Sequence, residues 1–287
     1  MDTVGFAETD GFEVNAPRKN TWHYRDWVIR SLNSDLSYKR FVRLQIAGDI
    51  IEPNSLDGAT AVGFLVAGIR KPVDGVTAER KAEIRHDELE ELAGRVSQTF
   101  LGLSINCARC HDHKFDPISS REYYQVAAAL DGVRHGERKI STDSTSANKT
   151  HLTVYSTLAT DPAPMRIYRG GDPLQAGEEV AAGGLKAIAG LPPSFSVDKT
   201  ATDGERRLAL AHWITDDRNA IFHRAIVNRV WNQHYGFGLV NSPNDLGFRG
   251  GQTSHSRLID WLAIQFREQG YSLKALHRMI LSSATFQ

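Results

Sequence analysis

The only two cysteines of this 287-residue chain, Cys107 and Cys110, lie in one short stretch, NCARCHDHKFDPI, at residues 106–118. Cysteines this close together cannot join distant parts of the chain, so the fold has no disulfide framework. The chain must instead fold by burying apolar side chains, which make up 41% of its residues and suffice for two domains. The two thiols are therefore left for local chemistry in one loop.

Charge and hydropathy exclude two classes of interaction. Lys plus Arg and Asp plus Glu number 34 each, so no bulk charge draws the chain to nucleic acid and we expect no nucleic-acid partner. No run of about 18 apolar residues occurs, so we expect no transmembrane segment. The opening residues also lack the basic and apolar regions of a signal peptide.

The spacing of apolar residues predicts helices on both sides of the cysteines. Residues 79–101 carry apolar side chains every three to five positions, as on one face of an α-helix: Ile84, Leu89, Leu92, Val96 and Phe100. After the cysteines, Ser119 and Glu122 form a capping-box pattern that begins a second helix, which ends at Gly132. The cysteine loop is therefore expected to connect two helices.

The middle of the chain has a different character. Residues 136–200 are rich in Gly, Pro and Ser, which predicts an irregular linker with one short strand, HLTVYSTL, at residues 151–158. Helical spacing returns after Thr202 and Glu205, a second capping-box pattern. We therefore predict a mainly α fold in which two helical lobes, residues 1–135 and 201–287, are joined by an irregular middle with little β structure.

The sequence C-x-x-C-H is typical of covalent haem attachment. Cys107 and Cys110 could form thioethers to the two vinyl groups of a haem c, and His111 could ligate the iron from the same side. A sixth iron ligand would come from a distant residue, such as Met165, Met279 or a histidine of the second lobe. The residues leave other chemistry open.

Zinc or another divalent metal is one alternative, because His111, His113 and Asp116 crowd further donors next to the two thiols. Against a structural zinc site, no second cysteine pair exists to complete it. A redox dithiol or an inert pair is also possible, although a helix rather than a strand is expected before the motif.

A polar, glycine-rich stretch near residue 240 has two interpretations. Asp245 could act as an acid or base with Arg229 or Arg249 as an anion clamp. The other interpretation is that Asn244 and Asp245 cap a turn while Arg229 packs as part of the surface. We favour it, because Asn and Asp are common in turns.

Two long stretches resemble a known pair of domains. TWHYRDWVIRSLNSDLSYKRFVRLQIAGD and TFLGLSINCARCHDHKFDPISSREYYQVAAALDGV resemble the planctomycete-type cytochrome c-like domain, a domain of unknown function. GERRLALAHWITDDRNAIFHRAIVNRVWNQHYGFGLVNSPNDLGFRGG and SHSRLIDWLAIQFREQGYSLKALHRMILSSATFQ resemble the planctomycete surface domain that normally follows it. The resemblance covers most of residues 1–135 and 164–287.

This resemblance implies an exported, envelope-associated protein whose haem motif is Cys107, Cys110 and His111. It also implies that the chain is an internal fragment, truncated at its C-terminus, and that an extra glycine interrupts the family's R-G-D-P string in RGGDP, residues 169–173. Our main hypothesis is a haem c-binding redox protein that exchanges electrons with a partner. The alternative is a cell-surface binding or scaffold module whose cysteine loop holds a divalent metal or only shapes a turn, and a third is a hydrolase that uses Asp245.

Overall fold

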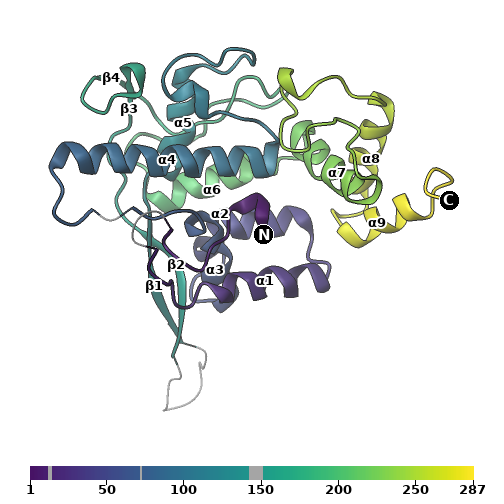
Figure 1. Ribbon diagram of the computed structural model, residues 1–287, viewed down its shortest axis with the longest axis horizontal. Helices are drawn as coiled ribbons and strands as arrows, with labels where there is room; N and C mark the ends of the chain where they lie inside the picture. The colour runs from purple at the N-terminus through teal and green to yellow at the C-terminus, as the bar shows by residue number, and fades with distance from the viewer. Residues whose placement is uncertain (12–14, 72, 142–150) are drawn as a thin grey trace.

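The computed structural model describes residues 1–11, 15–71, 73–141 and 151–287, and helices make up most of its regular structure. In Figure 1, α4 crosses the middle of the molecule, with α1, α2 and α3 on one side, α5 on the other, and α7, α8 and α9 beyond one end. The mainly α prediction is confirmed. The helices are α1 (Trp22–Asn33), α2 (Tyr38–Ile51), α3 (Leu56–Ala61), α4 (Ala78–Leu101), α5 (Ser120–Leu130), α6 (Asp203–Ile214), α7 (Ala220–Tyr235), α8 (Ser256–Glu268) and α9 (Leu273–Leu281).

Local sequence explains where these helices begin and end. At the start of α4 the Thr77 hydroxyl accepts the N–H of Arg80, and at its end Gly102 adopts a φ of +60°, a left-handed conformation that favours glycine. The predicted limits of this helix, residues 79–101, are therefore nearly right. Two predicted capping boxes are confirmed at the starts of α5 and α6: Ser119 with Glu122, and Thr202 with Glu205.

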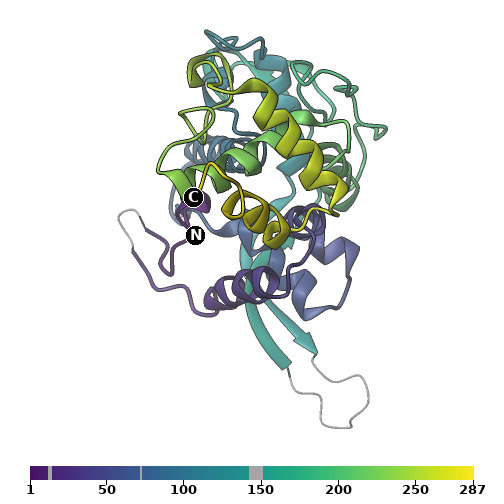
Figure 2. The ribbon, with the colours of Figure 1, turned by 90° about the vertical axis from the view of Figure 1, so that its right-hand side faces the viewer.

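The middle of the chain contains more β structure than predicted. The predicted strand at residues 151–158 is confirmed as β2 (His151–Ala159), but its antiparallel partner β1 (Val133–Ser141) was missed. A second small sheet of β3 (Arg166–Tyr168) and β4 (Ala176–Glu179) was also missed. Strand β1 is rich in charged residues and mostly not buried, so it lacks the apolar alternation by which a strand is recognised. Figure 2 shows the β1–β2 hairpin projecting from the body of the molecule.

The predicted linker is also more than a connection, because much of it packs into the core. Val180, Leu185, Ile188 and Phe195 are buried within the main apolar cluster. The glycines here allow close packing and not only backbone flexibility. A Cβ atom on Gly184, for example, would lie 2.3 Å from the Trp213 ring. The prediction of an irregular Gly/Pro/Ser-rich connection is therefore not confirmed, because this region contains strands and packs into the core.

The two helical segments share one main apolar cluster. Its members run along the described chain from Val4 to Ile280 and include residues of α2, α4, α5, α6 and α7. Tyr38 of α2, for example, stacks on Phe222 of α7 with their ring centres 5.4 Å apart. The predicted domain limits stay a prediction, but the helices on either side of them are packed against each other.

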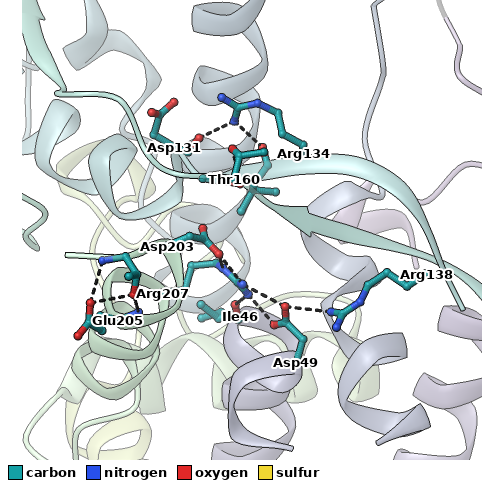
Figure 3. Close-up of polar contacts among 12 residues, drawn as sticks. Ile46, Asp49, Asp131, Arg134, Arg138, Thr160, Asp203, Glu205 and Arg207 are labelled. Atoms are coloured by element: carbon teal, nitrogen blue, oxygen red, sulfur yellow. Dashed lines mark hydrogen bonds and ion pairs between the residues drawn. The ribbon is translucent and has the colours of Figure 1, made fainter. Parts of the chain in front are cut away.

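A fully buried arginine, Arg207 on α6, forms ion pairs that link α6 to α2. Its guanidinium donates to the Asp49 carboxylate of α2 at 2.8 and 3.1 Å, to Asp203 at 2.8 Å and to the Ile46 carbonyl at 2.9 Å. Figure 3 shows the two carboxylates around this guanidinium, with Arg138 of β1 on the other side of Asp49. Arg207 is 0% exposed and both carboxylates are 4% exposed, so each charge depends on the others for compensation.

We expect Arg207→Met to lower the free energy of unfolding by about 3–5 kcal/mol, because it leaves the buried Asp203 carboxylate without an ion-pair partner and the Asp49 carboxylate with Arg138 alone. Urea denaturation measures this loss. The control is Arg218→Gln, which removes an arginine paired with Asp216 at the surface and should leave stability nearly unchanged. Equal losses in the two variants would contradict the central role of the buried network.

Candidate functional site

The predicted haem motif forms an exposed loop between α4 and α5. Residues Asn106–Arg109 form a short 3₁₀ turn, and the chain then runs to the start of α5 at Ser120. Cys107 and Cys110 are both unpaired and exposed, and His111 is exposed beside them. The structure thus presents all three predicted residues at the surface of one loop.

Partly buried polar contacts hold this loop against α4. The Arg109 guanidinium donates to Asp87 at 2.9 Å and to Glu90, and the Asn106 amide donates to the Glu90 carbonyl at 3.2 Å. Burial lowers the pKa of Arg109, but hydrogen bonds to the two carboxylates outweigh it and the net shift is upward. Tyr124 of α5 also donates its hydroxyl to the Arg109 carbonyl at 2.9 Å. The thiols therefore project from a loop whose base is fixed from two helices.

The start of α5 fixes the other end of the loop. The Ser120 hydroxyl donates to the Ala108 carbonyl at 2.7 Å, and the Ser120 N–H donates to the Asp112 carboxylate at 2.8 Å. These contacts connect Ala108, which follows Cys107, and Asp112, which follows His111, to the same helix terminus. The spacing between the thiols and the imidazole is therefore maintained by the fold as well as by the sequence.

A distant glycine provides the space next to Cys110. A Cβ atom on Gly171 would lie 2.7 Å from the Cys110 Sγ and 3.4 Å from the Arg109 side chain. Gly171 has a φ of +76° and its neighbour Gly170 a φ of +63°, so both belong to the conformation that favours glycine. The interrupted RGGDP string thus has a local role here, because its second glycine accommodates the thiol.

The His111 ring is oriented by its own main chain. Its Nδ1 lies 2.8 Å from the Asp112 carbonyl oxygen. A carbonyl oxygen can only accept a hydrogen bond, so this contact places the proton of a neutral imidazole on Nδ1. The Nε2 lone pair is then left for a ligand.

The alternative metal donors His113 and Asp116 are used within the turn itself. The Asp116 N–H donates to His113 Nδ1 at 2.9 Å, and the Asp116 carboxylate accepts the Phe248 N–H at 2.6 Å. Both side chains are largely buried, whereas His111 is exposed. Within the residues that the structure describes, no three His, Cys, Asp or Glu side chains gather in a way that could hold a metal ion.

Exposed aromatic and basic side chains surround the loop. Phe115 is 42% exposed and Phe248, from the loop that Asp116 contacts, is 80% exposed. The Arg249 guanidinium lies 5.1 Å from the centre of the Phe115 ring, and the Lys114 ammonium lies 5.4 Å from it. An apolar surface with cations at its edge therefore adjoins the cysteine loop. No sequence pattern indicates this surface, because Phe248 is 133 residues from Phe115 along the chain.

The second polar stretch forms hydrogen bonds within its own turn and with the end of α4. The Asp245 carboxylate accepts the Gly247 N–H at 3.0 Å within its own turn. Arg229 donates to the Asn244 side chain and to main-chain carbonyls at the end of α4, while Arg249 lies over Phe115. These contacts match the interpretation of a capped turn with packed arginines.

The two predicted methionine ligands occupy different parts of the core. Met165 is 5% exposed, and its carbonyl accepts the Val180 N–H next to the β3–β4 sheet. Met279 lies on α9, which packs mainly on α7 and α8. Neither position tests the sixth ligand, which stays a prediction.

Sequence reasoning missed an aromatic cluster behind the loop. The His86 ring of α4 lies 4.4 Å from the Tyr168 ring edge to face, and Tyr168 lies 5.6 Å from Tyr124, whose hydroxyl contacts the loop. Burial, followed by the charge of Arg109, lowers the pKa of His86 to about 4. His86 is therefore neutral at pH 7, and its position on the inner face of α4 was the only signal in the sequence.

Gly171→Ala should destabilise the protein more than Gly170→Ala. Both variants place alanine at positive φ, but only the first forces a methyl group against the Cys110 sulfur, and such overpacking costs about 1–3 kcal/mol. Thermal unfolding measures the difference. Adding Cys110→Ala to Gly171→Ala should recover most of the extra loss, and no recovery would show that the thiol is not the obstacle.

His86→Asn should flatten the fall in stability as the pH drops from 6.5 to about 4. The folded pKa of His86 is about 4, below its unfolded value of 6.5, so unfolding takes up a proton in this range and stability is lost as the pH falls. Urea denaturation at several pH values measures the slope. His255→Asn, at an exposed position, is the control, and identical slopes in His86→Asn and the unmodified protein would refute the assignment.

The comparisons with known proteins agree with the order of domains expected from the sequence. Residues 1–135 match the family model PSCyt2, described as "Protein of unknown function (DUF1549)", and residues 206–287 match PSD1, described as "Protein of unknown function (DUF1553)". No curated protein and no solved structure is significantly similar to the chain. Among the described residues, no helix is both long enough and apolar enough to cross a membrane. Two separate parts of the chain are thus similar to two domain models of unknown function, DUF1549 followed by DUF1553.

Proposed function

We propose that the cysteine loop attaches a haem c, with thioethers at Cys107 and Cys110 and with His111 as an iron ligand, and that the protein exchanges electrons with a partner. The observation that carries this proposal is the combination of two free, exposed thiols with an imidazole whose Nδ1 faces the Asp112 carbonyl. When bound, the haem supplies one-electron chemistry.

The hydrogen bond at His111 suits an iron ligand for a specific reason. A histidine ligand normally donates its second ring N–H to a carboxylate, a carbonyl or water, which fixes the ring and raises the basicity of the coordinating nitrogen. Here the Asp112 carbonyl accepts from Nδ1, so Nε2 presents its lone pair. Because Ser120 binds the Asp112 carboxylate, the start of α5 helps to hold this carbonyl in place.

The fold also supports the thiols. Arg109, between the two cysteines, is anchored on α4, and Gly171 leaves the space that Cys110 needs. The exposed rings of Phe115 and Phe248 offer apolar contact near the loop, and Lys114 and Arg249 offer positive charge that suits the carboxylates of a haem. The two thiols, the His111 imidazole and the side chains around them are therefore compatible with a haem c.

Exposure of the loop favours electron transfer over catalysis on an enclosed substrate. Cys107, Cys110 and His111 all lie at the surface, where a partner protein could approach a bound haem directly. The exported, envelope-associated location implied by the sequence resemblance belongs to the same proposal. The alternative, a surface binding or scaffold module in which the loop is purely structural, draws support from the dense hydrogen bonding beneath the loop.

Production with the haem c attachment machinery tests the proposal. The purified protein should show a Soret band that remains with the polypeptide after denaturation and acid extraction, because thioether bonds survive both treatments. The double variant Cys107→Ser and Cys110→Ser should lose the retained band. His111→Ala should keep covalent haem but change its absorption spectrum, since the iron loses a ligand.

Matched controls separate attachment from folding. His255→Ala, at an exposed histidine outside the loop, should keep both the band and the spectrum of the unmodified protein. Circular dichroism should show the same helix content in every variant. A well-folded protein that carries no covalent haem under these conditions would reject haem attachment and leave the scaffold interpretation.

A further inference from the structure

A second region of the molecule, away from the cysteine loop, concentrates positive charge around a cavity. The cavity has a volume of about 300 Å³ and lies between the segment after the short helix Val62–Val66, the first half of α4 and the start of β1. Five cationic side chains and a single carboxylate line it, together with one histidine and two apolar residues. The lining residues are Arg70, Lys71, Val73, Lys81, Ile84, Arg85, Glu88, Arg134 and His135.

Two of the arginines meet at one atom. Arg85 of α4 donates to the Asp131 carbonyl oxygen at 2.8 Å, and Arg134 of β1 donates to the same oxygen. Figure 3 shows Arg134 turned toward this main-chain oxygen and not toward the Asp131 carboxylate. Two guanidinium groups that share one acceptor repel each other, and the repulsion is strong because both are half-buried.

The carboxylates nearby offset only part of this charge. Arg85 forms ion pairs with Glu88 at 3.2 Å and Asp131 at 3.4 Å, and Lys71 pairs with Asp87 at 2.8 Å. Arg134 instead donates to the main-chain oxygens of Asp131 and Val133, which carry no net charge. The cavity therefore keeps an excess of positive charge at its floor, and Arg70 and Lys81 add exposed positive charge to its lining.

Nearby cations shift the pKa values of two lining groups in the same direction as burial does. Burial, followed by the charges of Arg18, Arg95, Arg70 and Arg85, lowers the pKa of His135 to about 3. Burial and then the charge of Arg85 also lower the pKa of Arg134. His135 is thus uncharged at neutral pH. The charged groups that an anion would meet in the cavity are the five cations and Glu88.

We propose that this cavity binds a tetrahedral oxyanion, the phosphate or sulfate group of a small ester. Guanidinium groups suit such anions because their planar N–H donors match the oxygen geometry, and Arg85 and Arg134 already lie side by side. Ile84, which is 4% exposed, and Val73 give the cavity an apolar wall for the organic part of the ester. The volume is at the lower end for ligand cavities, which limits the ligand to a small molecule.

Calorimetric titration at low ionic strength tests the proposal with phenyl phosphate, phenyl sulfate and inorganic phosphate as probes. The protein should bind at least one phenyl ester more tightly than inorganic phosphate, and the better ester identifies the anion. Arg134→Gln should weaken that binding at least about tenfold, as expected for the loss of a charge-assisted hydrogen bond. Lys81→Gln, at an exposed position where folding is not at risk, should weaken it by a smaller factor.

The control is Arg257→Gln, which removes an exposed positive charge from α8 and should leave the affinity unchanged. Circular dichroism of each variant separates loss of binding from loss of fold. The proposal would be overturned if the protein bound none of the probes. It would also be overturned if Arg257→Gln and Lys81→Gln weakened the affinity equally. An affinity for inorganic phosphate equal to that for both esters would overturn the assignment of an ester ligand. The cavity shares no residue with the cysteine loop, so the result is independent of haem attachment.

Discussion

The structure depends on one buried ionic contact, in which Arg207 lies between Asp49 and Asp203. It brings α2 and α6 together, and the apolar core forms around that junction. Burying three charges is unfavourable unless each is hydrogen-bonded, and here the Ile46 carbonyl accepts a further hydrogen bond from Arg207 while Arg138 donates one to Asp49. The arrangement therefore specifies how the two matched segments pack, in a way that apolar contacts alone would not.

The helices could be predicted from the sequence because their signals are local. Thr202 and Glu205 cap α6 through contacts only three residues apart, and Gly102 ends α4 by its own conformation. Strand β1 was not predicted although its partner β2 is the next strand in the chain, because its own residues are largely charged and show no apolar alternation. The packing of the middle region depends likewise on partners such as Trp213, which lie far away in the sequence.

The same distinction applies to the candidate sites. Cys107, Cys110 and His111 could be named in advance because a motif brings them together in five residues. Gly171, Phe248 and Asp87 support that loop from distant positions, so no local pattern announced them. The basic cavity is a stronger case, since its cations come from three segments and the chain as a whole is electrically balanced. Helix α4 is common to both regions, because Asp87 pairs with Arg109 beneath the loop and with Lys71 of the cavity.

The separation of Asp49 and Arg207 along the chain has a consequence for biosynthesis. Asp49 leaves the ribosome 158 residues before the arginine that neutralises it. Until α6 and α7 emerge, the newly made N-terminal helices lack both Arg207, the buried partner of Asp49, and the apolar surface of Phe222 against which Tyr38 stacks. Such long-range contacts slow folding and leave a nascent chain open to aggregation, so the N-terminal helices can complete their native packing only after α6 and α7 have been synthesised.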